Sequence, residues 1–129
     1  MDITPRLDMI GIAVADMAKA LAFYRRLGLD LPEDGDHVET TLPGGIRLAF
    51  DTEAVIRSFH PSWSRGRGGR TDLAFLLPDA AAVDALHAEL VTAGHESEIA
   101  PFDAFWGQRY AVVLDPDGNG VDLFAPLAS

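Results

Sequence analysis

The feature of this sequence that most constrains its fold is an internal repeat. Residues 10–16, Ile-Gly-Ile-Ala-Val-Ala-Asp, are matched in pattern 63 positions later by residues 73–79, Leu-Ala-Phe-Leu-Leu-Pro-Asp. In both copies a β-rich run ends at an aspartate, which is a preferred N-cap of a helix. A repeated pattern indicates similar structural modules. We therefore expect two related halves within the 129 residues.

Each of these aspartates is followed by a helical pattern that ends at a glycine. Apolar residues at helical spacing predict a first helix over 17–27, before Gly28, and a second over 80–93, before Gly94. Short β-like segments separated by turn-forming residues come next, over 37–42, 46–50, 109–114 and 121–124. Each half is therefore predicted to be a β-α-β-β-β module in an α+β protein.

The module boundaries follow from these elements. The first module is expected over 5–51 and the second over 70–127, within a single domain covering 1–129. The segment 52–69 has low apolar content and several arginines, so we interpret it as the linker. A linker of that length is long for a compact domain, and a short helical turn is expected over 53–57.

Strand alternation predicts which face of each sheet covers a helix, because successive side chains point to opposite faces. In the first strand the bulky face consists of Ile10, Ile12 and Val14, and in the strand after the linker it consists of Leu73, Phe75 and Leu77. The opposite faces carry small or polar residues such as Gly11 and Ala13. If two four-stranded sheets curve around each other, these faces line a cleft.

Composition excludes several classes of function. Ten basic against twenty acidic residues give a net charge of −10 and a pI near 4.5, which disfavours nucleic acids and anionic membranes as partners. The chain has no cysteine, hence no disulfide or thiolate chemistry. It also lacks a long apolar run and a signal-peptide pattern, so we expect a cytoplasmic protein.

The order of these modules and several motifs resembles a known family. The motifs are Phe23-Tyr24, Leu27-Gly28, Trp106-Gly107-Gln108-Arg109, Asp115-Pro-Asp-Gly-Asn119 and Val121-Asp122-Leu123. Together they resemble the vicinal oxygen chelate superfamily, which comprises glyoxalases, bleomycin-resistance proteins and extradiol dioxygenases. The resemblance implies two βαβββ modules that form curved mixed sheets around a cleft. It also implies a homodimer, because relatives commonly dimerise.

In metal-using members of that superfamily, four ligands come from the first and last strand of each half. The resemblance carries these positions onto Met9, Arg47, Asp72 and Asp122. Methionine is a soft ligand, and arginine places a fixed charge where a cation would sit. We therefore expect no metal and no cofactor. Arg47 is instead expected to pair with Asp72 and Asp122, unless these are only hydrated polar residues.

Aromatic residues mark a second group of candidates. Phe102, Trp106 and Tyr110 cluster before and within a late strand, and Trp63 lies in the linker. Large rings in loop-like contexts contact ligands or subunits, while core packing is the alternative for Trp106. We interpret 102–106 as a hinge-like segment that folds over the mouth of the cleft. His37, His60 and His95 are isolated in sequence, and none is assigned as a general base.

These observations favour a metal-free protein that binds a small molecule. The expected ligand is a planar aromatic compound, cationic or neutral, such as a natural product or antibiotic that the protein sequesters. No catalytic residue is assigned, and the expected binding residues are Met9, Arg47, Trp63, Asp72, Phe102, Trp106, Tyr110, Asp122 and Phe124. The alternatives are a superfamily enzyme (a glyoxalase-like lyase, an isomerase or a dioxygenase) and an interaction module with an unused cleft.

Overall fold

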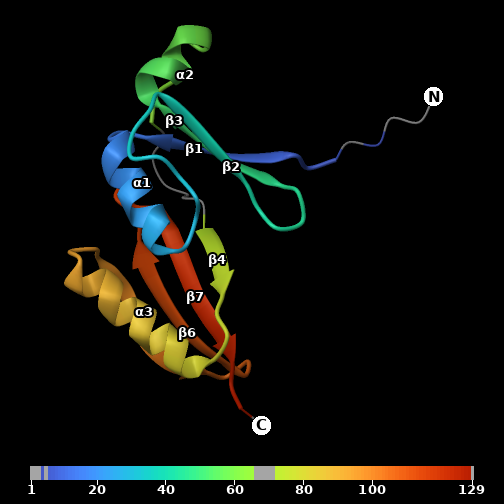
Figure 1. The fold of residues 1–129 in the computed structure, drawn as a ribbon, viewed down its shortest axis with the longest axis vertical. Coiled ribbons are helices and arrows are strands. Elements are labelled where there is room, and N and C mark those ends of the chain that lie inside the picture. Colours follow the sequence, from blue (N-terminus) through green and yellow to red (C-terminus); the bar gives the residue numbers. More distant parts are fainter. Residues whose placement is uncertain (1–3, 5, 66–71, 129) are drawn as a thin grey trace. The chain divides into compact units, whose positions relative to one another are not determined.

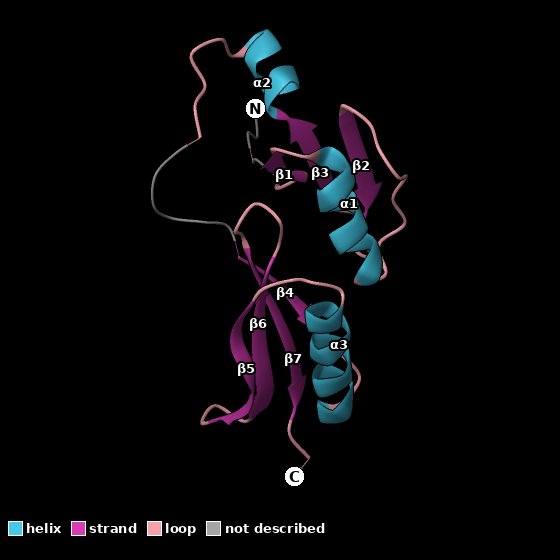
Figure 2. Ribbon diagram, turned by 90° about the vertical axis from the view of Figure 1, so that its left-hand side faces the viewer, coloured by secondary structure: helices cyan, strands magenta, loops and turns pink. Residues whose placement is uncertain are grey.

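The computed structural model describes residue 4 and residues 6–65 and 72–128. The chain divides into two compact units, Met1–Arg65 and Gly66–Ser129, and this boundary falls inside the segment interpreted as the linker. In each unit a strand, a helix and two further strands follow each other along the chain; the first unit then ends with a helix and the second with a strand (Figures 1 and 2). None of the helices described is long and apolar enough to cross a membrane.

The first unit contains a mixed sheet of three strands and two helices. Its elements are β1 (Met9–Val14), α1 (Met17–Arg26), β2 (His37–Thr41), β3 (Arg47–Thr52) and α2 (Glu53–Phe59). The strand order is β1-β3-β2, with β1 parallel to β3 and β2 antiparallel to it. This sheet has one strand fewer, among the described residues, than the four expected.

The second unit repeats this plan with an additional strand. Its elements are β4 (Asp72–Leu76), α3 (Ala80–Thr92), β5 (Ser97–Ala104), β6 (Gln108–Leu114) and β7 (Gly120–Pro126). The strand order is β4-β7-β6-β5, in which only the β4–β7 pair is parallel. The predicted α+β class with two βαβββ-like mixed sheets is confirmed.

The helices begin where the sequence predicts. The Asp16 carboxylate accepts a hydrogen bond from the amide of Lys19 at 3.1 Å, and the Asp79 carboxylate accepts one from the amide of Ala82 at 2.8 Å. Both contacts satisfy an amide of the first helical turn that has no partner within the helix. Gly28 and Gly94, just past the two helices, have φ near +90° and +98°. That conformation suits glycine, which has no Cβ to clash with the backbone.

Helix α2 occupies the start of the expected linker. The Thr52 hydroxyl accepts a hydrogen bond from the amide of Val55, and the helix continues to Phe59. The turn expected over 53–57 is therefore longer than predicted. The helix has only seven residues, too few for periodicity to fix its end, and none of them is buried.

The core of each unit lies between a sheet and a helix. In the first unit Ile12, Val14 and Phe50 are buried on one side of the sheet, and the Tyr24 ring of α1 lies 5.0 Å from that of Phe50. In the second unit Val83 and Leu90 of α3 are buried with alternate residues of β6 and β7, namely Ala111, Val113, Val121, Leu123 and Ala125. The predicted alternation of strand faces is confirmed, and each sheet keeps a second face that is directed away from its helix (Figure 2).

Candidate functional site

Six of the nine expected binding residues lie in the second unit, on or beside the face of its sheet opposite α3. On β6, Arg109 pairs with Asp84 of α3 at 2.9 Å and therefore points to the helix side of the sheet. Because side chains alternate along a strand, Gln108, Tyr110 and Val112 lie on the opposite face. Strand register then places three of the others: Phe102 is opposite Tyr110, Phe124 is opposite Tyr110 on the other side, and Asp122 is opposite Val112. Asp72 is on this face as well, because it lies two residues before Ala74, the β4 partner of Asp122.

Three rings on this face form what we call the aromatic cluster: Phe102, Trp106 and Tyr110. The ring centroids lie 6.2 Å apart for Phe102–Trp106, 6.1 Å for Phe102–Tyr110 and 5.3 Å for Trp106–Tyr110. All three pairs meet edge to face, an arrangement favoured by the ring quadrupoles. Phe102 and Trp106 remain 37% and 48% exposed, so the cluster presents ring surface instead of burying it.

The expected hinge over 102–106 is wrong. Phe102 to Ala104 belong to β5, and Phe105, Trp106 and Gly107 form a three-residue hairpin turn into β6. The Gly107 amide donates to the Ala104 carbonyl at 3.0 Å, and Gly107 has φ near +90°. This is the glycine conformation that closes a three-residue hairpin. A strand and a tight turn hold Trp106 in place, where the sequence alone indicated a loop.

Gln108 also positions Trp106, and sequence reasoning did not select it. The indole Nε1–H of Trp106 donates to the Gln108 Oε1 atom at 2.8 Å. This hydrogen bond fixes the rotation of the indole and satisfies its single donor. The signal that identifies Gln108 is its place two residues after Trp106, directly opposite Ala104 in the hairpin.

One carboxylate lies against the aromatic cluster. The Tyr110 hydroxyl donates to the Asp122 Oδ2 atom at 2.5 Å. Burial, then the hydrogen bond to Asp122 and the negative charges of Asp122 and Asp72, raise the pKa of Tyr110 to about 12. Tyr110 is therefore a neutral donor at any physiological pH, and Asp122 is held in one orientation.

The other three expected residues lie in the first unit. Met9 and Arg47 are register partners at the start of β1 and β3, on the face opposite α1. Trp63 follows α2, with the Arg57 guanidinium 5.3 Å above its ring, a cation–π contact. These three residues and the aromatic cluster belong to different units, so their assembly into one site stays a prediction.

The partners of Arg47 differ from those expected. Its guanidinium donates to Glu39 at 2.9 and 3.0 Å and to Asp8 at 2.7 Å, both in its own unit. These hydrogen bonds raise the pKa of Arg47 further, and they lower the pKa values of Asp8 and Glu39. Pairing with Asp72 and Asp122 of the second unit stays a prediction.

The same face of the first sheet carries a chain of alternating charge, Asp51–His37–Glu39–Arg47–Asp8, which we call the charged chain. His37 is placed opposite Asp51 in the β2–β3 ladder, and Arg47 opposite Thr41. The imidazole of His37 lies between the carboxylates of Asp51 and Glu39. His37, which is isolated in the sequence, therefore has two carboxylate partners in the fold. The missed signal was the 42–46 turn, which sets the register that brings His37 and Asp51 together.

A family model covers almost the whole chain. The model that describes the Glyoxalase/Bleomycin resistance protein/Dioxygenase superfamily matches residues 6–123. The chain belongs to this superfamily. No curated protein matches it.

Solved structures of the superfamily share this fold. A glyoxalase/bleomycin resistance protein/dioxygenase from Nocardioides is 24% identical with a TM-score of 0.75, covering 100% of this chain and 88% of that one. A family enzyme from Burkholderia phytofirmans is 23% identical with a TM-score of 0.82, covering 95% and 100%. A lactoylglutathione lyase from Agrobacterium tumefaciens is 21% identical with a TM-score of 0.67, covering 96% of each chain. At these identities the likeness shows the fold alone.

The residues that the resemblance carries onto metal-ligand positions, Met9, Arg47, Asp72 and Asp122, do not fit a divalent metal. The set is a thioether, a guanidinium and two carboxylates, and the guanidinium of Arg47 is bound by two other carboxylates. Across the described part of the chain, no group of three or more His, Asp or Glu side chains is placed to hold a metal ion. We therefore derive no chemistry through a metal.

Proposed function

We propose that the protein binds a planar aromatic small molecule, cationic or neutral, at the aromatic cluster, and sequesters it without a metal. The observation that carries this proposal is the combination of three edge-to-face rings with an oriented carboxylate on one sheet face. Exposed ring surface stacks on a flat ligand, and a carboxylate beside it selects positive charge.

The details of the cluster support a rigid binding surface. Trp106 is fixed by the hairpin turn and by the hydrogen bond to Gln108, so a ligand does not have to order it. The Oδ2 atom of Asp122 accepts the hydrogen bond from the Tyr110 hydroxyl. A carboxylate has about four acceptor sites, so capacity remains for the N–H groups of a ligand. We propose further that the ligand is a drug or natural product and that the protein sequesters it in the cytoplasm.

The first experiment compares ligands of the same ring size and opposite charge. Thermal-shift screening with 9-aminoacridine, a planar cation, and anthracene-9-carboxylate, a planar anion, tests the selectivity. A ligand at about 100 times its Kd adds about 2.7 kcal/mol to the free energy of unfolding. We expect stabilisation by the cation and little by the anion. Stabilisation by the anion alone would contradict the proposal.

Two variants separate the charge of the site from the charge of the chain. Asp122→Asn removes the carboxylate beside the cluster, whereas Asp103→Asn removes one on the same hairpin that pairs with Arg109 instead. We expect the first variant to weaken binding of 9-aminoacridine about tenfold and the second to leave it nearly unchanged. Equal losses in both would show that net charge, and not the site, attracts the ligand.

A superfamily enzyme is the second candidate, and one observation favours it. His37 lies between the carboxylates of Asp51 and Glu39, an arrangement that suits an acid–base group. The sequence alone did not indicate these partners. Elemental analysis and a chelator discriminate the two candidates. About one bound transition metal per chain, or an activity abolished by chelation, would favour the enzyme over the metal-free binding protein.

We also propose that the protein is a homodimer. β5 is an edge strand of the second sheet, and most of its residues are exposed. Edge strands that remain uncovered are prone to pair with another chain. Light scattering at micromolar concentration is expected to give about twice the chain mass of 13.9 kDa. A persistent monomer would contradict this expectation.

A further inference from the structure

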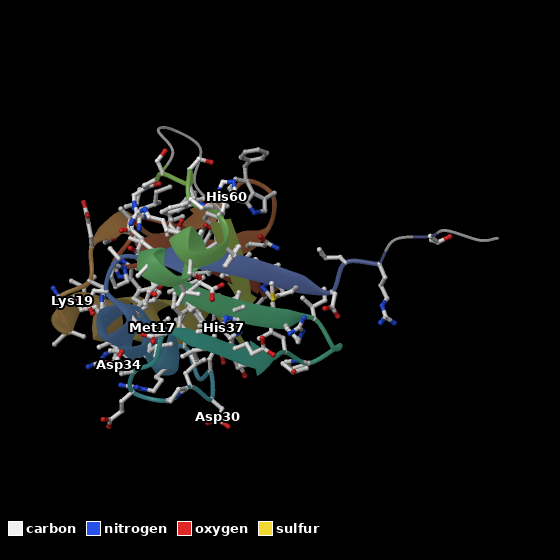
Figure 3. All side chains as sticks on the ribbon, turned by 90° about the horizontal axis from the view of Figure 1, so that it is seen from above. Met17, Lys19, Asp30, Asp34, His37 and His60 are labelled. Carbon is white, nitrogen blue, oxygen red and sulfur yellow. The ribbon has the colours of Figure 1, made fainter. Side chains whose placement is uncertain are left out.

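The first sheet holds a histidine whose two ring nitrogens both face a carboxylate. His37 is the first residue of β2, and in Figure 3 it lies at the strands of the first sheet. Its Nδ1 atom is 2.5 Å from the Asp51 Oδ1 atom, and its Nε2 atom is 3.0 Å from the Glu39 Oε2 atom. Asp51 is its ladder partner on β3, and Glu39 follows two residues later on the same face.

Both contacts are hydrogen bonds only when the ring carries two protons. A carboxylate only accepts, so each ring nitrogen must donate, and a neutral imidazole has a single N–H. The hydrogen bonds to Asp51 and then to Glu39 raise the pKa of His37 above its usual value, and partial burial opposes them. The geometry therefore describes the imidazolium form.

Loss of one proton must break one of these contacts, and the structure indicates which. Asp51 is the less exposed partner, with 18% of its side chain accessible against 38% for Glu39, and its contact is the shorter one. Glu39 also has a second partner, since Arg47 donates to both of its carboxylate oxygens. The proton on Nδ1 is thus the better held, and the proton on Nε2 is the one that leaves.

The surroundings of His37 contain both signs of charge. Asp51 and Arg47 come from β3, and Glu39 comes from β2 itself. The remaining titratable groups lie on the adjoining loop and on the elements packed against β3. They are Asp30, Glu33, Asp34 and Asp36 of the loop, Asp8 before β1, Glu53 and Arg57 of α2, and Lys19, Tyr24, Arg25 and Arg26 of α1. Asp8 is bound by Arg47, and Glu53 is bound by Arg65. Asp51 and Glu39 are thus the carboxylates in hydrogen-bond contact with the ring.

The ring of His37 is accessible from solvent. Its side chain is 48% exposed, so a small molecule can reach it without displacing a large side chain. The neighbouring row of the sheet runs from Glu39 over the fully buried Ala49 of β3 to Gly11 of β1, where an added Cβ atom would meet no other atom within 4 Å.

We infer that His37 is an acid–base site of the first sheet with two defined states. Protonated, it bridges Asp51 and Glu39. Neutral, it keeps the proton on Nδ1, which donates to Asp51, and leaves the Nε2 lone pair free to accept a proton. The proton moves between Nε2 and solvent, or an oxygen or nitrogen atom of a bound molecule, and no other bond changes. A base oriented by a carboxylate on its second nitrogen is the arrangement used in general acid–base catalysis. This inference does not depend on the ligand site of the second sheet.

Nitrogen-15 NMR of the full chain, titrated with pH, tests this inference. The shifts of the two ring nitrogens report both the midpoint of the titration and which nitrogen keeps its proton. We expect a midpoint above that of the same residue in the urea-unfolded chain, and a neutral form protonated at Nδ1. A midpoint at or below that of the unfolded chain, or a neutral form protonated at Nε2, would overturn the inference.

Variants separate the two carboxylates. Asp51→Asn is expected to lower the proton affinity of His37 by about tenfold and to abolish the preference for Nδ1, whereas Glu39→Gln lowers the affinity less and keeps that preference. Glu53→Gln, which removes a carboxylate that binds Arg65, is the matched control and is expected to change neither. Amide spectra show whether each variant stays folded. If Glu53→Gln moved the midpoint as far as Asp51→Asn, the site would reflect only general charge.

Discussion

The face of the first sheet opposite α1 carries a chain of paired charges, whereas the face of the second sheet opposite α3 carries aromatic rings together with the carboxylates of Asp122 and Asp72. Both faces follow the same strand alternation, with one parallel pair in each sheet. On the first, five groups of alternating sign bind each other from Asp51 to Asp8. On the second, Asp122 accepts a hydrogen bond from the neutral hydroxyl of Tyr110.

This difference shows how one repeated framework supports two kinds of chemistry. On the first face each carboxylate of the charged chain already has a cationic partner, and one of these partners is a histidine, so this face is suited to hold a proton. A carboxylate paired with a neutral donor keeps its charge, so the second face is suited to attract a cation. The repeat sets the strand positions, and the side chains placed on them set the chemistry.

The largest expected effect on the free energy of unfolding comes from removing the Asp115 carboxylate, which stabilises the turn of the second sheet. Asp115 is 4% exposed, and its carboxylate accepts hydrogen bonds from the amides of Asp117 and Asn119 and from the Asn119 side chain. These contacts close the turn between β6 and β7, the strands that carry Tyr110 and Asp122. Asp115→Ala is expected to lower the free energy of unfolding by about 2–3 kcal/mol, measured with urea.

The matched control for this substitution lies in an exposed loop of the first unit. Asp30→Ala removes the same group from a solvent-exposed position and is expected to change the free energy of unfolding by less than about 0.5 kcal/mol. Similar losses in both variants would mean that the Asp115 contacts do not support the second sheet.

A smaller effect is expected from the pair that defines the second face. Tyr110→Phe removes the hydroxyl that donates to Asp122 and leaves that partly buried carboxylate without its donor. We expect a loss of about 1–2 kcal/mol in the free energy of unfolding. In an Asp122→Asn background the same substitution should cost less, and a double-mutant cycle measures the difference. Additive effects would show that the two groups act independently.

The smallest effect is expected in the first face and depends on pH. Because the folded-state pKa of His37 is raised, its stabilisation is fully present below the unfolded value near 6.5 and is lost as pH rises through the folded value. The wild type should therefore lose stability relative to His37→Gln across that window. The exposed setting limits the change to about 0.2–1 kcal/mol. An increase in relative stability with rising pH would contradict the assignment.

The sequence predicted the framework better than it predicted the contacts on the two faces. The caps at Asp16 and Asp79 and the alternation of β1 follow from local rules, and the structure has them. The β-α-β-β-β module requires a strand at β5, but its residues were not located, because they are mostly exposed and their pairing with β6 contains register shifts, which leave no clear alternation. The hinge expected at Trp106 was the consequence of that omission.

The contacts on the two faces depend on register, which a pattern of residue types does not fix. His37 and Asp51 are 14 positions apart and meet only because the turn between β2 and β3 pairs them. Tyr110 and Asp122 meet across β6 and β7 for the same reason. The residue types marked Tyr110 and Asp122 as candidates, but the hydrogen bond between them required the fold.

The most direct test of the central claim is the affinity of the aromatic cluster for a planar cation. Isothermal titration calorimetry with 9-aminoacridine compares the wild type with Trp106→Ala and with Phe59→Ala, which removes an exposed ring of the first unit. We predict a loss of at least about tenfold in affinity for Trp106→Ala and no loss for Phe59→Ala, with both variants folded. Unchanged affinity in Trp106→Ala would show that the ligand does not bind at the aromatic cluster.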